Sequence, residues 1–177
     1  MKILITPHPF LKKTVKPVTS WTPKLQKQLE QMIVLLKQSH DPQGMGLAAT
    51  QVGIDKRFFI TLDKENIQVF INPKIIKTST KMLSDKYKNN KKHPLEGCLS
   101  IPKFWGFVDR PYSITLSFQY LQGLTLKAVS KTFNGLDAIS IQHERDHLDG
   151  ILFTDHILKQ GGTIYKETKK GLIPLNS

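Results

Sequence analysis

Two histidines four residues apart, His143 and His147, with Glu144 directly after the first, are the residues most able to do chemistry. On a helix, residues four apart lie on one face, so both imidazoles can reach one metal ion. Glu144 projects about 100 degrees away round the helix and can instead take a proton from a water on the metal. The alternative is a polar helix with two unrelated histidines. The spacing favours a hydrolytic metal site.

The third ligand decides the class of such a site, because a catalytic metal of this kind needs three protein ligands and an open position for water. One group of metalloproteases has a third histidine three residues after the motif glycine, but here Phe153 follows Gly150 at that distance. Another group uses a glutamate from a later helix, for which Glu167 is a candidate. Cys98, the single cysteine, is the other candidate, because a thiolate is a soft and strongly donating ligand. A lone cysteine can equally be a small buried hydrophobe.

The stretch GMGLAATQVG, residues 44–53, is the other unusual feature. A G-x-G-x-x-A pattern is typical of dinucleotide binding only when a strand directly precedes the first glycine, and here a helix and a turn are expected instead. We interpret the stretch as a chain packed closely by its small residues, with Gln51 as its one strong side-chain donor. A buried amide is costly unless it is paired, so we expect either an oxyanion or a structural hydrogen bond as its partner.

Hydrophobic periodicity predicts the helices that position these residues. An amphipathic helix begins at Pro23 and runs through about residue 39, and a turn follows over residues 40–44. A second helix, capped by Thr132 or Asn134 and ended by Gly150, carries the HERDH motif.

Short runs rich in Phe, Ile and Val predict strands at residues 57–62, 68–71 and 75–78, and period-two alternation predicts a β-hairpin over 114–128. The order of helix, short strands and helix indicates an α+β domain. We expect largely antiparallel, short-stranded sheets around a central metal-binding HExxH helix, together with the N-terminal amphipathic helix.

The length and composition predict a single catalytic domain over residues 1–177. Residues 77–92 carry six lysines and one acid, which predicts a basic loop excursion from that domain. Residues from about 157 to 177 are also lysine-rich, and we expect them to form a basic C-terminal tail.

The net charge of +12 predicts attraction to polyanions such as RNA or a ribosome. Only Arg57, Arg110 and Arg145 among the 26 basic residues are arginine, which argues against sequence-specific recognition of nucleic acid. No apolar run approaches the roughly 20 residues that a membrane span needs, and the N-terminus lacks the pattern of a secretory signal. Together with the single cysteine, these features favour the cytoplasm.

Three stretches, GMGLAATQ, EGCLS and QHERDHLDG, occur in this order and closely resemble the three signature motifs of the peptide deformylase family. The opening ILITPHPFLKKTVKPV resembles the N-terminal arm of that family. The resemblance implies a metal-dependent amidase that removes formyl from the N-terminal methionine of nascent peptides and releases formate. It implies that Cys98, His143 and His147 are the ligands, usually of ferrous iron, although zinc, nickel or cobalt can occupy such sites.

The same resemblance assigns further roles. Glu144 would be the general base and then the acid that protonates the leaving amine. The side-chain amide of Gln51 and the backbone N–H of Leu99 would hold the developing oxyanion, with Gly46 shaping the approach. Residue-by-residue matching places a set of residues around the pocket for the methionine side chain: Met45, Glu96, Leu136, Ile139 and Ser140.

The sequence departs from the family pattern at Arg145, where an apolar residue is usual, and at residues 103–106, which do not match the residues that often bind the peptide backbone. Two alternatives stay open. One is a zinc metallopeptidase of HExxH type with Glu167 as third ligand, and the other is a basic, non-catalytic module associated with RNA or the ribosome. For the deformylase we expect formyl-methionyl nascent peptides as substrates, transient association with the ribosome, no membrane, and a monomer.

Overall fold

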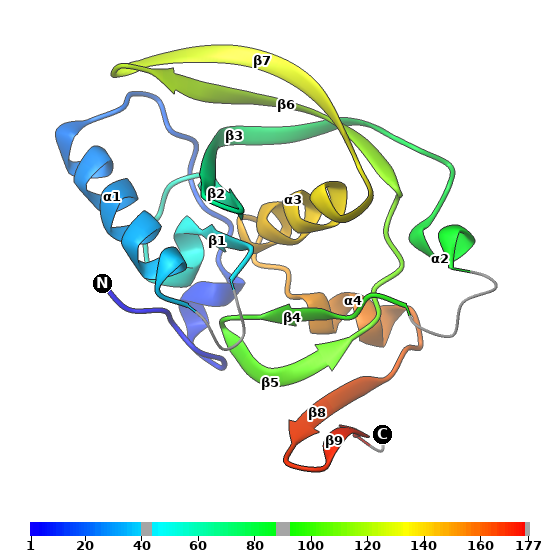
Figure 1. Cartoon of the computed structure of the whole chain (residues 1–177). Helices are drawn as coiled ribbons and strands as arrows, with labels where there is room; N and C mark the ends of the chain where they lie inside the picture. Colours follow the sequence, from blue (N-terminus) through cyan, green and yellow to red (C-terminus); the bar gives the residue numbers. More distant parts are fainter. Residues whose placement is uncertain (40–43, 88–92, 176–177) are drawn as a thin grey trace.

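The computed structural model describes residues 1–39, 44–87 and 93–175, and its first long helix lies where the sequence predicts it (Figure 1). Helix α1 (Pro23–Lys37) is capped by Thr22, whose side chain accepts a hydrogen bond from the Leu25 N–H at 3.2 Å. Proline is tolerated at the first helical position because the N–H there has no partner within the helix. The predicted turn at 40–44 lies, apart from Gly44, outside the described residues. One face of α1 is buried in the core: Leu25, Leu29, Met32 and Leu36.

A five-stranded antiparallel sheet has the order β1-β2-β3-β6-β7. Its strands are β1 (Gly46–Ala48), β2 (Phe58–Asp63), β3 (Asn66–Thr78), β6 (Ser113–Gln122) and β7 (Thr125–Asn134). The predicted hairpin is therefore present as β6 and β7. The two strands predicted at 68–71 and 75–78 are one strand, β3, whose pairing with β6 shifts register between Ile71 and Lys74. Asn72 at this shift has a φ of +50°, so the Asn-Pro pair marks a bulge and not a turn.

A second sheet of four antiparallel strands has the order β4-β5-β8-β9. Its strands are β4 (Glu96–Cys98), β5 (Ile101–Gly106), β8 (Ile164–Thr168) and β9 (Gly171–Pro174). The last two strands and the end of helix α4 (Phe153–Lys159) occupy the segment that the sequence predicts as a basic tail. That prediction differs from the structure because β8 forms by pairing with β5, a long-range contact that local composition does not report.

The segment predicted as a basic loop excursion, residues 77–92, also has regular structure in the part that is described. Strand β3 continues to Thr78, and a single helical turn, α2 (Leu83–Lys86), follows. Leu83 is buried, and the Ser84 N–H and hydroxyl donate to Asp109 at 2.9 and 2.8 Å. One apolar side chain and one carboxylate thus hold this lysine-rich segment against the domain. Residues 88–92 of the prediction lie outside the described part.

Helix α3 (Gly135–His147) has Asn134 at its N-cap, so the predicted helix is present and contains HERDH. Figure 1 shows it beneath the five-stranded sheet, and residues of both pack in one core cluster. Gly150, with a φ of +72°, lies at the turn beyond its end. Two short 3-10 helices, η1 (Pro9–Lys12) and η2 (Ala49–Val52), complete the described elements. The expected α+β class with antiparallel sheets is confirmed. None of the helices in the described ranges has the length and hydropathy of a membrane-spanning segment.

Candidate metal centre

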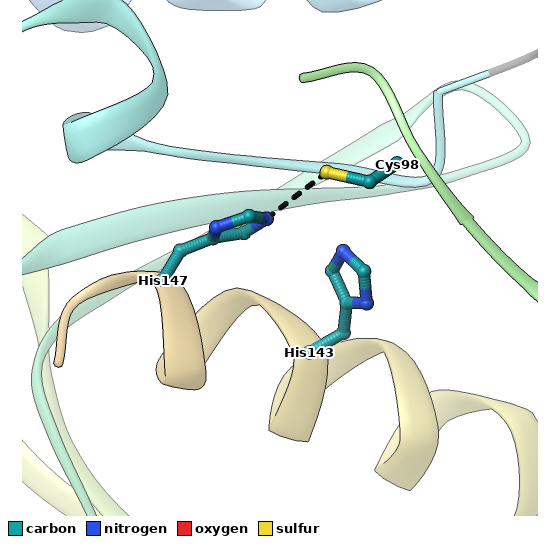
Figure 2. Close-up of side chains that lie close together, drawn as sticks. All are labelled: Cys98, His143 and His147. Carbon is teal, nitrogen blue, oxygen red and sulfur yellow. Dashed lines mark hydrogen bonds between the residues drawn. The ribbon is translucent and has the colours of Figure 1, made fainter. Parts of the chain in front are cut away.

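Helix α3 and strand β4 bring together three potential metal ligands, Cys98, His143 and His147. The ligand atoms of these buried side chains all lie within 4.8 Å of one another. Figure 2 shows the two histidines one turn apart on α3, with Cys98 facing them, and Cys98 Sγ lies 3.2 Å from His147 Nε2. One thiolate and two imidazoles suit zinc or another divalent transition metal.

Cys98 reaches α3 through an irregularity at the end of β4. The pairing of β4 with β5 shifts register between Gly97 and Cys98, and such shifts turn a side chain away from its regular direction. The other candidate ligand, Glu167, lies in β8, where its Oε2 accepts a hydrogen bond from Trp105 Nε1 at 2.9 Å. It is not part of the ligand cluster found among the described residues. The structure therefore brings Cys98 to the histidine pair, and the alternative with Glu167 as third ligand is wrong.

His143 is oriented by a buried carboxylate, Glu96, whose Oε2 lies 2.9 Å from His143 Nδ1. This contact leaves the Nε2 atom of His143 to face a metal. Arg110 donates to Glu96 Oε2 at 3.0 Å and to Asp146 Oδ2 at 2.7 Å, so it links β4 to α3. Burial alone raises the pKa of Glu96, but Arg110 and His143 outweigh it and lower that pKa to about 2.

The sequence interpretation missed Arg110 and Asp146 as parts of this site. Arg110 is one of only three arginines in a chain rich in lysine, and arginine is the residue suited to buried, multiply bonded carboxylates. That scarcity was the one signal that could have pointed to it. Asp146 also accepts a hydrogen bond at 2.8 Å from His156 Nε2, so α4 is attached to the same network.

The environment of Cys98 favours the deprotonated thiolate, which is the form that binds metals. Burial raises the pKa of its thiol, but His147 and His143 outweigh burial and lower it to about 5. The thiolate, the form that ligates metal ions, is therefore the favoured state at neutral pH.

Glu144 lies beside the ligand cluster and lines the same cavity. Its carboxyl group is buried, and Oε2 has no hydrogen-bond partner among the described residues. Burial raises the pKa of this carboxyl group to about 7, against the opposing effect of the two histidines. A carboxyl group with such a pKa can both accept and return a proton near neutrality. An unpaired buried oxygen next to three ligand atoms fits a site that holds a metal and a water.

Gly46 makes room for this carboxylate. A Cβ atom at position 46 would lie 2.6 Å from Glu144 Cγ and Oε1, well inside van der Waals contact. The residue at this point of β1 must therefore be glycine if Glu144 is to keep its position.

Gln51 places its amide at the cluster. Its Oε1 accepts a hydrogen bond from the Ala48 N–H at 2.8 Å, which fixes the orientation of the amide. Its Nε2 then points to Cys98 Sγ at 3.4 Å and to Ser100 Oγ at 3.2 Å. The expected structural hydrogen bond is therefore present. The same Nε2 donor lies next to the ligand atom of Cys98, so it is also placed where an oxyanion could form.

A cavity of about 170 Å³ opens onto the cluster. All five residues predicted for the methionine pocket line it, together with Gly46, Gln51, Leu99 and Glu144. Glu96 differs from the other predicted pocket residues because its oxygens are already bonded to Arg110 and His143. Sequence reasoning missed five further lining residues: Gly44, Pro94, Leu95, Gly97 and Trp105.

Arg145, the departure within the HERDH motif, faces carboxylates and not the ligands. Its guanidinium lies 2.9 Å from Asp149 Oδ2, and Arg57 lies 2.6 Å from Oδ1 of the same residue. Arg145 is thus held by ion pairs with Asp149 and, at 3.5 Å, with Asp146 Oδ1, and it does not line the cavity.

The antiparallel α+β fold and the Cys-His-His cluster with its adjacent glutamate define a metal-dependent hydrolase. The chain belongs to the peptide deformylase family: the family model for polypeptide deformylase matches residues 1–162. The peptide deformylase of Phenylobacterium zucineum is 34% identical over 175 residues, which cover 95% of each chain. That of Hydrogenovibrio crunogenus is 35% identical over 100% of this chain and 98% of its own.

Solved structures agree with this assignment. The crystal structure of peptide deformylase from Thermotoga maritima matches with a TM-score of 0.74 and 33% identity, and covers 88% of this chain and 95% of its own. A non-catalytic RNA-binding module is therefore not the class of this protein.

Proposed function

We propose that the protein removes the formyl group from the N-terminal methionine of formyl-methionyl peptides and releases formate. One observation carries the proposal: three ligand atoms within 4.8 Å of one another lie beside a buried glutamate with an unpaired oxygen. This arrangement, in a member of the deformylase family, supports hydrolysis of a formamide bond at the cluster.

Cys98, His143 and His147 would hold one divalent cation, and ferrous iron is our proposal for the physiological metal. Zinc, nickel and cobalt suit the same set of one thiolate and two imidazoles. A cation bound there supplies Lewis acidity toward water and the formyl oxygen. Glu96 contributes by holding the ring of His143 through Nδ1, at 2.9 Å, so that its other nitrogen faces the cation.

Glu144 is the proposed proton carrier. Its carboxylate takes a proton from the attacking water and then gives it to the leaving amine of the methionine. The support is a pKa raised by burial to about 7, together with the unpaired Oε2 at the cluster. Gly46 serves this step because any larger residue would collide with the glutamate.

The proposed oxyanion donors are the side-chain amide of Gln51 and the backbone N–H of Leu99. The bond from the Ala48 N–H fixes the Gln51 amide before substrate arrives, so little reorganisation is needed when charge develops on the formyl oxygen. Leu99 directly follows the ligand Cys98 and lines the same cavity, which supports its role.

The methionine side chain would occupy the cavity among Met45, Leu136, Ile139 and Ser140. Three of these four residues are apolar and Ser140 adds one hydroxyl, a lining suited to an unbranched thioether. Glu96 also lines this cavity, and its carboxylate is bonded to His143 and Arg110.

The proposed setting is the cytoplasm, where formylated chains leave the ribosome. The net charge of +12 supports transient attraction to ribosomal RNA, and the scarcity of arginine supports contact without sequence readout. We propose a monomer as the working form.

The proposal is tested by assaying formate release from formyl-Met-Ala-Ser with protein purified without oxygen. The acetylated peptide is the substrate control, and we expect release from the formyl peptide alone. Glu144→Gln should lose at least about 100-fold in kcat, since general acid–base catalysis contributes that much or more. Glu30→Gln on α1, an exposed carboxylate that accepts from Gln26, is the matched control and should keep wild-type activity. No release by metal-loaded wild type, or full activity of Glu144→Gln, would contradict the proposal.

A further inference from the structure

Trp105 lines the cavity but has no role in the proposed reaction. It lies in β5, within the residues 103–106 that do not match the family pattern, and its indole is half-buried. Two other apolar residues of the same cavity, Met45 and Leu136, are exposed to solvent by 52% and 55%. By contrast, the cavity residues Ile139 and Glu144 are buried. The cavity therefore has a buried floor at the ligands and an exposed apolar rim.

The Trp105 ring is fixed from below by Gly97. The two residues are directly opposite each other in the pairing of β4 with β5. A Cβ atom at position 97 would lie 2.6 Å from Trp105 Cζ3, so the indole covers the glycine backbone without space between them. Because Gly97 directly precedes the ligand Cys98, this packing sets the indole beside the metal centre.

The ring is held from the side by the C-terminal hairpin. Trp105 Nε1 donates to Glu167 Oε2 at 2.9 Å, and the backbones pair Trp105 with Tyr165. The hairpin of β8 and β9 begins at residue 164, after the last residue matched by the family model, 162. Figure 1 shows the hairpin next to β5, on the side of the molecule away from the five-stranded sheet.

We propose that Trp105, positioned by Glu167, selects an apolar and above all an aromatic side chain at the substrate residue that directly follows methionine. The inference rests on the proposed deformylase function. With the methionine side chain inside the cavity, the rest of the peptide must leave across the exposed rim, where it meets the indole face. An aromatic ring gains from stacking on an indole as well as from burying apolar area, whereas a small or charged side chain gains little.

The test compares formyl-Met-Phe-Ser with formyl-Met-Ala-Ser through the ratio of their kcat/KM values. We expect wild type to favour the phenylalanine peptide by about ten-fold, the scale typical of one apolar contact, and mainly through KM. Trp105→Ala should bring the ratio close to one, and Trp105→Phe should restore part of it. Glu167→Ala should lower the ratio by about three-fold to five-fold, as loss of one hydrogen bond predicts. Glu167→Gln, which keeps an acceptor oxygen, should restore the ratio. Lys169→Ala, in the turn of the same hairpin, is the matched control and should leave it at the wild-type value.

A binding measurement tests the inference without catalysis. The chain has two tryptophans, and Trp21 is buried in the core beside Phe58. In the Trp21→Phe variant the remaining emission comes from Trp105, and the product Met-Phe-Ser should change it more than Met-Ala-Ser at equal concentration. Formate release with the same peptide ratio in wild type and Trp105→Ala, or equal emission changes with both products, would overturn this inference and leave the proposed function standing. Absence of release from every formyl peptide would instead overturn the proposed function.

Discussion

Replacing Arg110 by methionine removes the guanidinium that lies between two buried carboxylates. The side chains of Arg110, Glu96 and Asp146 are exposed by only 5%, 8% and 7%, so water cannot replace the lost partner without entering the core. Methionine is apolar and, although shorter than arginine, has a similar volume, so the change mainly removes the charge and its hydrogen bonds. After the change, Glu96 keeps His143, and Asp146 keeps His156 together with Arg145, whose guanidinium lies 3.5 Å from Asp146 Oδ1.

The expected cost is large. Removing one partner of a buried ion pair costs about 3–5 kcal/mol, because the other charge stays desolvated. Two carboxylates lose Arg110, but each retains one histidine, so we expect a total within the same range of about 3–5 kcal/mol. At roughly 2–4 °C per kcal/mol for a domain of this size, the melting temperature should fall by about 6–20 °C.

Urea unfolding followed by circular dichroism measures this cost. Lys12→Met is the control, because the Lys12 side chain is 53% exposed and pairs at the surface with Asp155, an interaction that contributes about 1 kcal/mol or less. Adding Asp146→Asn to Arg110→Met removes one stranded charge and should recover at least about 1 kcal/mol, as a coupled pair predicts. Equal stability of Arg110→Met and wild type, or further destabilisation by the second change, would refute this reasoning.

Three further predictions follow from the site and the core. Gly46→Ala should reduce kcat by at least about 100-fold while the protein keeps its metal, because the added Cβ displaces Glu144 and not a ligand. Formate release measures the loss of activity and metal analysis measures the metal content; loss of metal would contradict the prediction. Cys98→Ala should retain less than about a tenth of the bound metal, since two imidazoles alone leave an incomplete set; full metal content after dialysis would disprove the assignment of this ligand. Met32→Ala should destabilise the fold by about 2–5 kcal/mol, since Met32 is fully buried. Leu158→Ala, at a side chain that is 68% exposed, is the control and should change the free energy of unfolding little. Similar urea midpoints for these two variants would argue against the described core.

Local patterns predicted the elements whose stability is local. Thr22 and Pro23 mark the start of α1 because an N-cap acceptor and a proline each act within one helical turn. The spacing of His143 and His147 placed both on one helix face for the same reason. The family motifs then supplied Cys98, which lies 45 residues before His143 and reaches it only through the tertiary fold.

The features that sequence did not predict depend on long-range pairing. Strands β8 and β9 lie in a lysine-rich segment and form because β5 offers an edge, which no local period reports. The Arg110 network joins β4 to α3 and α4 through side chains that are far apart along the chain. From sequence, Trp105 is only one of the residues 103–106 that depart from the family pattern. The pairing of β5 with β4 and β8 is what places it at the cavity.

The most direct test of the account is a titration of metal-stripped protein with ferrous iron under anaerobic conditions, with formate release from formyl-Met-Ala-Ser as the readout. One ligand set of Cys98, His143 and His147 predicts that the rate rises with added iron and reaches its plateau at about one equivalent. Formate release that is the same before iron is added, or its absence at full occupancy, would contradict the central claim that this cluster carries a metal-dependent deformylation.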